Sequence, residues 1–237
     1  MSKHVDQNTT REFYNNTPEI WASDDHWHLW SKQQIEHYLH SLVFQSTDYV
    51  LNAGSGGNAY GIVCNMVHVD IAEQKLTGIP NAIISSVEKM PIDDAVFDAA
   101  ICVGSVINYC DAAASIAEFA RVLKENGTLV LEFENSSGYE YKGSSAYCRS
   151  ATVVTVKFQG QDHTQWLYSL QYIKSLLAAN GFVIDDIFPY QIMSSLALKY
   201  LKKEAVAVKY AILDSFARKL PFLSAHANNI IIRCRKL

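Results

Sequence analysis

Short apolar segments alternate with helical patterns along most of this 237-residue chain, and this alternation constrains the fold more than any other feature of the sequence. Seven segments have the length and composition of β-strands: 48–54, 66–71, 81–86, 97–104, 127–135, 181–188 and 228–236. Within the fourth, AAICV at 99–103 is a continuous apolar run, as expected of a parallel strand that helices cover on both faces. We therefore predict an α/β fold with a doubly wound, Rossmann-like sheet of seven strands.

A helix is predicted between the fourth and fifth strands, within residues 111–127. Ile116, Phe119, Ala120 and Leu123 share one helical face there. Gly127 follows them, and glycine is common just after the end of a helix. This segment is therefore expected to cross over the sheet as a helix that ends before Gly127.

Three segments fall outside the alternation. Residues 1–45 have helical patterns, 136–165 are polar and tyrosine-rich before a β-prone run, and 189–225 form an apolar and basic helical insertion between the sixth and seventh strands. Segments near the carboxyl ends of the strands usually determine what a doubly wound fold binds. We predict one domain over 1–237, with a core at 46–135 that these three segments cap.

Charge is unevenly distributed along the chain. Residues 1–188 hold 11 Lys and Arg against 22 Asp and Glu, whereas residues 189–237 hold 9 against 2. The acidic main part disfavours nucleic acid as a partner. The basic insertion at 189–225 is consistent with either a lid or a weak contact with an anionic membrane surface.

A glycine-rich turn, NAGSGGNAYG at 52–61, directly follows the first strand. Glycines at such a turn let the backbone approach a ligand closely. Gly54, Gly56 and Ala59 also satisfy the dinucleotide fingerprint, and Asp70 ends the second strand, where a ribose-binding carboxylate belongs. These residues alone leave a nicotinamide dinucleotide and an adenosyl ligand both open.

Further motifs follow in a fixed order. LNAGSGG, HVDI, SVEKMPIDDAVFD and RVLKENGTLVLEF resemble, in order and separation, the class I S-adenosylmethionine-dependent methyltransferases, in the branch that methylates small molecules. The resemblance implies methyl transfer to a small-molecule acceptor, with S-adenosylmethionine as cofactor and S-adenosylhomocysteine as product. Three positions depart from the family pattern: Asn52 replaces the acid of the loop, Asn58 its third glycine, and Ser86 the acid before strand four.

The resemblance also implies which residues hold the cofactor. The methionine part would lie against Asn52, Gly54, Ser55 and Gly56. The ribose would bind Asp70, and the adenine would lie near Ile71, Val87 and Glu88. The floor would consist of Val103 and Gly104, and the aromatic ring that closes the site would be Tyr14.

Candidate catalytic residues are chosen for their chemistry. Histidine is the side chain best suited to accept a proton near neutral pH, which points to His28 and to His163, expected in a loop at the carboxyl end of strand five. Tyr109 follows strand four and could orient a substrate. No metal is predicted, because the histidine pairs near residues 26–40 lack carboxylate or cysteine partners at matching spacing.

Two other functions remain open at this level. A binding or regulatory module would keep the fold and the cofactor without turnover, and an NAD-dependent oxidoreductase would share the glycine loop and Asp70. The second lacks a Tyr-x-x-x-Lys pair, since Tyr168 is followed by Tyr172 at that spacing. The chain has no apolar run near the ~20 residues that span a bilayer and no signal-peptide pattern, so a cytoplasmic location is expected. Its oligomeric state is left open.

Overall fold

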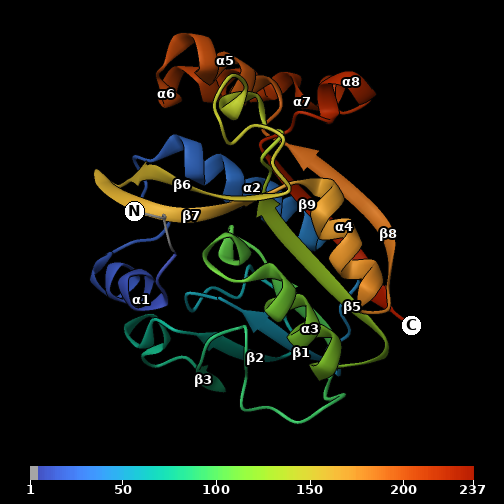
Figure 1. Ribbon diagram of the computed structural model, residues 1–237. Coiled ribbons are helices and arrows are strands. Elements are labelled where there is room, and N and C mark those ends of the chain that lie inside the picture. The colour runs from blue at the N-terminus through green and yellow to red at the C-terminus, as the bar shows by residue number, and fades with distance from the viewer. Residues whose placement is uncertain (1–4) are drawn as a thin grey trace.

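The computed structural model describes residues 5–237, so the first four residues of the expected N-terminal cap lie outside the described range. Seven strands form one sheet in the order β3-β2-β1-β4-β5-β9-β8 (Figure 1). Their bounds are β1 Tyr49–Ala53, β2 Asn65–Asp70, β3 Ala82–Ile84, β4 Phe97–Cys102, β5 Leu123–Glu134, β8 Phe182–Tyr190 and β9 Asn229–Lys236. The first five are parallel, and β9 runs antiparallel to both β5 and β8. The predicted α/β sheet of seven strands is confirmed.

Two helices cover one face of this sheet, α3 (Ala112–Val122) and α4 (Leu170–Ala179). Asp111 caps α3 by accepting the backbone N–H groups of Ala113 and Ala114 at 2.8 and 3.1 Å. Phe119 of α3 and Leu177 of α4 are fully buried in the larger of the two main hydrophobic clusters. The apolar stripe that predicted α3 is therefore the stripe that packs on the sheet.

The end of α3 differs from the prediction. The helix stops at Val122, and Leu123 already pairs with Phe97 of β4, so Gly127 lies within β5. Pairing of Leu123 with β4 ends the helix early. A helical pattern in the sequence does not show where such pairing begins.

The opposite face is covered from outside the alternating pattern. Residues 54–64, between β1 and β2, contain no helix, and β2 is followed only by the 3-10 turn η1 (Glu73–Leu76). Instead, α2 (His26–His40) lies behind the sheet in Figure 1, with Ile35 and Leu39 fully buried against Val50 and Ile101. The connection between β1 and β2 has no helix to cover this face of the sheet, and α2 from the N-terminal segment covers it instead.

The two other non-core segments lie over the carboxyl end of the parallel strands. The α1 helix (Gln7–Asn16) lies beside a separate hairpin of β6 (Ala151–Phe158) and β7 (Gln161–Tyr168), which the 3-10 turn η3 (Tyr139–Tyr141) precedes (Figure 1). The insertion between β8 and β9 consists of short helices: α5 Met193–Leu201, α6 Glu204–Ala207, η4 Val208–Leu213, α7 Asp214–Ala217 and α8 Pro221–Ser224.

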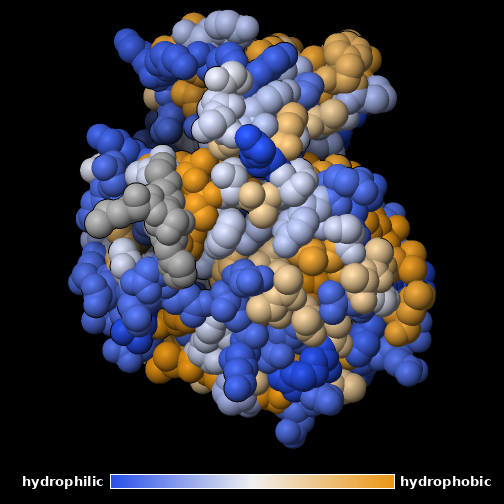
Figure 2. All heavy atoms as spheres, in the orientation of Figure 1, coloured by the Kyte–Doolittle hydropathy of each residue, from blue (hydrophilic) through white to orange (hydrophobic). Residues whose placement is uncertain are grey.

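This helical cap exposes apolar side chains. Tyr200, Ile212, Phe216 and Phe222 are each more than half exposed, and Figure 2 shows apolar atoms gathered on the cap around α8, at the upper right. In the described part of the chain, no helix combines the length and apolar character needed to cross a membrane.

Candidate functional site

The turn after β1 has a backbone that favours glycine at three positions. Gly54, Gly56 and Gly57 have φ values of +68°, +52° and +78°. A Cβ atom at Gly54 would lie 2.3 Å from Cγ1 of Val106, in the 3-10 turn η2 (Val106–Tyr109) that follows β4. The three glycines therefore allow the left-handed backbone of this turn. The lack of a side chain at Gly54 also lets the turn pack closely against η2.

Asp70, at the end of β2, is bonded to the same turn. One carboxylate oxygen accepts the N–H of Gly56 at 2.8 Å, and the other accepts the N–H of Ala72 at 2.8 Å. Burial raises the pKa of Asp70, and these backbone donors only partly offset that effect. A carboxylate has about four lone-pair sites, so both oxygens can still accept hydroxyl groups.

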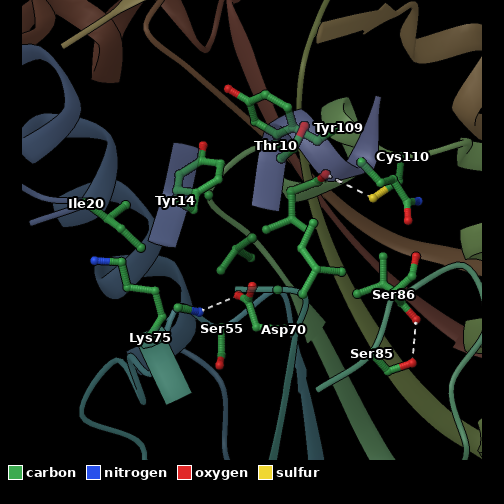
Figure 3. A pocket seen from close by; sticks show the side chains of 18 of the residues that line it. Thr10, Tyr14, Ile20, Ser55, Asp70, Lys75, Ser85, Ser86, Tyr109 and Cys110 are labelled. Carbon is green, nitrogen blue, oxygen red and sulfur yellow. Dashed lines mark hydrogen bonds between the residues drawn. The ribbon is translucent and has the colours of Figure 1, made fainter. Parts of the chain in front are cut away.

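A cavity lies beside this turn, at the carboxyl ends of the parallel strands. Nine of the eleven residues expected at the cofactor line it: Tyr14, Gly54, Ser55, Gly56, Asp70, Ile71, Val87, Val103 and Gly104. In Figure 3, Tyr14 and Tyr109 lie across this first cavity from Ser55 and Asp70.

Tyr14, from α1, covers the cavity. Its ring meets that of Tyr109 edge-on at 5.7 Å, and burial raises the pKa of Tyr14 to about 12. Burial also raises the pKa of Tyr109 well above its usual value. Both phenols therefore keep their protons near neutral pH and can donate hydrogen bonds but not accept a proton.

The other two expected cofactor residues do not line the cavity. Asn52 is buried behind the loop, where its Nδ2 donates to the carbonyl of Asn58 at 2.7 Å. Glu88 accepts the N–H of Asp111 at 2.8 Å, at the start of α3. Asn52 thus fixes the shape of the glycine turn from within, and Glu88 braces a neighbouring helix.

Ten lining residues were not anticipated from motifs: Gln7, Thr10, Ile20, Trp21, Tyr60, Lys75, Ser85, Ser86, Val106 and Cys110. Most come from α1, the segment after it, and the turns around β3 and β4. Lys75 holds two of these parts together, because its Nζ donates to the carbonyls of Thr17 and Pro18. Two of the ten lie within sequence motifs that could have indicated their place: Tyr60 in the glycine-rich turn and Ser86 in the third motif.

A second cavity adjoins the first. The two share walls formed by Tyr14, Ile20, Trp21, Gly104 and Tyr109. His28 lines the second cavity, and its Nδ1 lies 2.6 Å from Oδ2 of Asp25, the N-cap of α2. Burial alone would raise the pKa of Asp25, but hydrogen bonds and the charge of His28 outweigh it and lower that pKa.

His163 lies elsewhere than expected. It belongs to strand β7 rather than to a loop, and it lines neither cavity. Its ring is 4% exposed and packs at 3.9 Å against that of Phe13. Burial lowers the pKa of His163, and its Nε2 has no hydrogen-bond partner among residues 5–237. The β-prone run before it continues through residue 168 as a hairpin, which places this histidine behind Tyr14.

The first cavity fits an adenosyl amino acid by its own chemistry. The half-buried Asp70 carboxylate suits a ribose diol, and the glycine turn, where a Cβ at Gly54 would clash, suits close contact with the backbone. Ile71 and Val87 give the apolar edges that a planar base requires. Among the described residues, no cluster of three His, Cys, Asp or Glu side chains is arranged to hold a metal ion.

Comparison with known proteins agrees with this geometry. Residues 45–131 match the model of a methyltransferase domain family. An uncharacterized protein of Methanocaldococcus jannaschii is 24% identical over 217 residues, which is 82% of each chain.

Two solved structures share the fold at low sequence identity. A methyltransferase of Thermotoga maritima, described as a possible histamine N-methyltransferase, is 15% identical with a TM-score of 0.62, over 97% of this chain and 99% of that one. Geranyl diphosphate C-methyltransferase of Streptomyces coelicolor is 12% identical with a TM-score of 0.59, over all of both chains. The matched methyltransferase domain covers residues 45–131, and the solved structures show that the chain as a whole shares the fold of these methyltransferases.

Proposed function

We propose that the first cavity holds S-adenosylmethionine and that the second holds the small molecule to be methylated. The observation that carries this proposal is the shared wall of the two cavities. Trp21, Gly104 and Tyr109 border both, so ligands in the two cavities would meet there. Reactants that are held in contact and in line react far faster than free ones.

The first cavity would hold the cofactor by the residues already named. Asp70 would accept the ribose hydroxyls, the turn at 54–56 would lie along the methionine part, and Ile71 with Val87 would flank the base. When bound, this cofactor supplies an activated methyl group. The aromatic rings of Tyr14 and Trp21 exclude water from the junction.

His28 is the proton acceptor that the geometry favours. Its Nδ1 is engaged by Asp25, which orients the ring and leaves Nε2 as the nitrogen free to take a proton. Tyr109, whose raised pKa keeps it protonated, would orient the acceptor by donating a hydrogen bond. His163, which reaches neither cavity, has no part in this proposal.

The helical cap at 189–225 would serve as a lid. Gln191 and Glu204 from this segment line the second cavity, which supports that role. The exposed Tyr200, Phe216 and Phe222, among basic residues, also support weak contact with an anionic membrane as a second role. Sedimentation with anionic and neutral vesicles would test that contact, and equal recovery with both would argue for a lid alone.

Calorimetric titration with S-adenosylmethionine, S-adenosylhomocysteine and NAD tests the cofactor. Micromolar binding of the two sulfur compounds but not of NAD is the expected result. Binding without methyl transfer to any acceptor would favour a regulatory module. Binding of neither sulfur compound would refute the proposal.

A further inference from the structure

The second cavity is acidic. Four glutamates line it: Glu132 and Glu134 at the end of β5, Glu140 in η3 and Glu204 in α6. Of the side chains that line it, only those of Lys157 and His28 can carry positive charge. Within the described range, none of the four glutamates has a Lys, Arg or His nitrogen within ion-pair distance.

Neutral donors hold two of these carboxylates without cancelling their charge. Glu132 accepts hydrogen bonds from the N–H of Ser105, the hydroxyl of Tyr190 at 2.9 Å and Nδ2 of Asn229 at 2.7 Å. Glu134 accepts from Tyr141 and Gln165. Burial raises the pKa of both glutamates. A cation in the cavity would therefore relieve an existing electrostatic cost.

Glu140 also faces the cavity. Burial among the surrounding elements, together with the charges of Glu134 and Glu204, raises its pKa, and a hydrogen bond from the Asn228 side chain and the charge of Lys202 only partly oppose this rise. Burial likewise raises the pKa of Glu204, where His28 lowers it and Asp25 raises it. Although protein atoms crowd the Glu140 carboxyl group, Glu140 and Glu204 are the two of the four residues that keep solvent-exposed surface.

A second and independent observation concerns two side-chain amides in the same wall. Gln191 and Asn228 are 1% and 2% exposed, and Oε1 of the first and Oδ1 of the second have no hydrogen-bond donor in residues 5–237. The amide nitrogen of Gln191 donates to the hydroxyl of Ser31 at 2.9 Å and to the carbonyl of Trp27 at 3.4 Å. That of Asn228 donates to the carboxylate of Glu134 at 3.4 Å, and a carboxylate can only accept. Buried acceptors that lack a donor point to a ligand that brings N–H groups.

Aromatic rings complete the wall. Trp21, Trp27, Tyr14, Tyr109, Tyr141 and Phe158 line the cavity beside the carboxylates. Indole and phenol faces attract organic cations, and this attraction grows when water is excluded. The acidic groups described here are not arranged to chelate a metal ion.

We infer that the second cavity selects a methyl acceptor that binds as a protonated organic amine, held by the glutamates, by the two free amide oxygens and by the aromatic wall. If the amine nitrogen is the atom methylated, it first gives its proton to His28, and its lone pair then takes the methyl group while S-adenosylhomocysteine leaves. This inference rests on the proposed function, because it treats this cavity as the acceptor site. It excludes anionic acceptors such as carboxylates and phosphates, which the four glutamates would repel.

Calorimetry with matched ligands tests the inference. Tryptamine, tryptophol and indole-3-propionate share one ring system and differ in carrying a cation, a neutral hydroxyl or an anion; 2-phenylethylamine and 2-phenylethanol form a smaller pair. With S-adenosylhomocysteine present, at least one amine should bind ten-fold or more tighter than its neutral counterpart, and the anion should not bind. If neither amine binds tighter than its neutral counterpart, the inference is overturned.

Charge variants show where the selectivity arises. At pH 9, above the raised pKa of about 8 of Glu140, Glu140→Gln and Glu204→Gln should each weaken amine binding several-fold, whereas Lys157→Met should strengthen it. Glu125→Gln is the matched control, because Glu125 is exposed near the start of β5, away from Glu132 and Glu134. Unchanged amine affinity in all three cavity variants would overturn the inference.

The affinity for S-adenosylhomocysteine separates the two failures. If S-adenosylhomocysteine binds and amines show no preference, the acceptor class is wrong and the proposed function stands. If S-adenosylhomocysteine itself does not bind, the proposed function fails, and the amine inference fails with it.

Discussion

Oδ2 of Asp70 lies 2.8 Å from the backbone nitrogen of Gly56, so the acid that ends β2 and the glycine turn that follows β1 form one hydrogen-bonded unit. Removing the carboxylate would remove its hydrogen bond to the glycine turn as well as any contact to a ribose. Asp70→Ala should weaken S-adenosylhomocysteine binding by ~2 kcal/mol or more, about 30-fold. Glu73→Gln, an exposed acid on the adjacent turn, should leave the affinity unchanged in the same titration. Equal affinities for Asp70→Ala and wild type would remove Asp70 from the site.

Gly54→Ala should damage the site through crowding more than through backbone strain. A left-handed backbone costs a non-glycine residue about 1 kcal/mol wherever it occurs. At Gly54 the new methyl group would also lie 2.3 Å from Val106. Gly181→Ala is the control, since Gly181 has a similar φ of +78° and no atom within 4 Å of the added carbon. Thermal unfolding and cofactor titration should show a larger loss for Gly54→Ala, partly restored by Val106→Ala.

Glu140→Gln should stabilise the protein at alkaline pH. A carboxyl group whose pKa is raised on folding binds its proton more tightly in the folded state, so its stabilising contribution is present in acid and lost as the pH rises through the folded pKa. The neutral amide of Gln at position 140 does not ionise, so the variant does not lose this stability as the pH rises. The melting temperature of Glu140→Gln should exceed that of wild type at pH 8, by about 2 to 4 °C for each kcal/mol gained, and match it at pH 4. A variant that melts lower than wild type at pH 8 would contradict this account.

Tyr14 should act through its ring more than through its hydroxyl. The ring lines the first cavity and meets Tyr109 edge-on, and the phenol stays neutral because its pKa is raised to about 12. Tyr14→Phe should therefore keep S-adenosylhomocysteine affinity within about three-fold, whereas Tyr14→Ala should lose about ten-fold or more, since truncating an aromatic at a binding site commonly costs over 1 kcal/mol. Equal losses in both variants would assign the role to the hydroxyl instead.

The fold could be predicted from sequence because its signals are local. Each strand of the parallel core is a short apolar run with a turn after it, and the positions of Gly54 and Asp70 at two strand ends follow directly from that order. The carboxyl ends of neighbouring parallel strands meet at one edge, so residues far apart in sequence were correctly expected near each other.

The remaining parts depend on contacts between distant segments. Nothing near Trp21 or Lys75 in sequence indicates that they border the first cavity, because α1 and the chain after it reach that place only through tertiary packing. Asn52 occupies a family position but points away from the cavity, because its amide bonds to Asn58. His163 lies in a strand because the β-prone run that forms β6 pairs with the residues after it, which form β7. The sequence pattern indicated only the first of these two strands.

The sheet order also has a consequence for how the protein can assemble. Among residues 5–237, β8 pairs only with β9, which comes later in the chain and lies between β8 and β5. During synthesis, β8 and the helical cap are therefore made before the strand that joins them to the parallel core exists. Until residues 229–236 emerge, the edge of β5 that pairs with β9 remains open, and the second cavity lacks Asn229. Binding of an acceptor and completion of the sheet are thus tied to the same late event, and partly synthesised chains should be vulnerable to aggregation at that open edge.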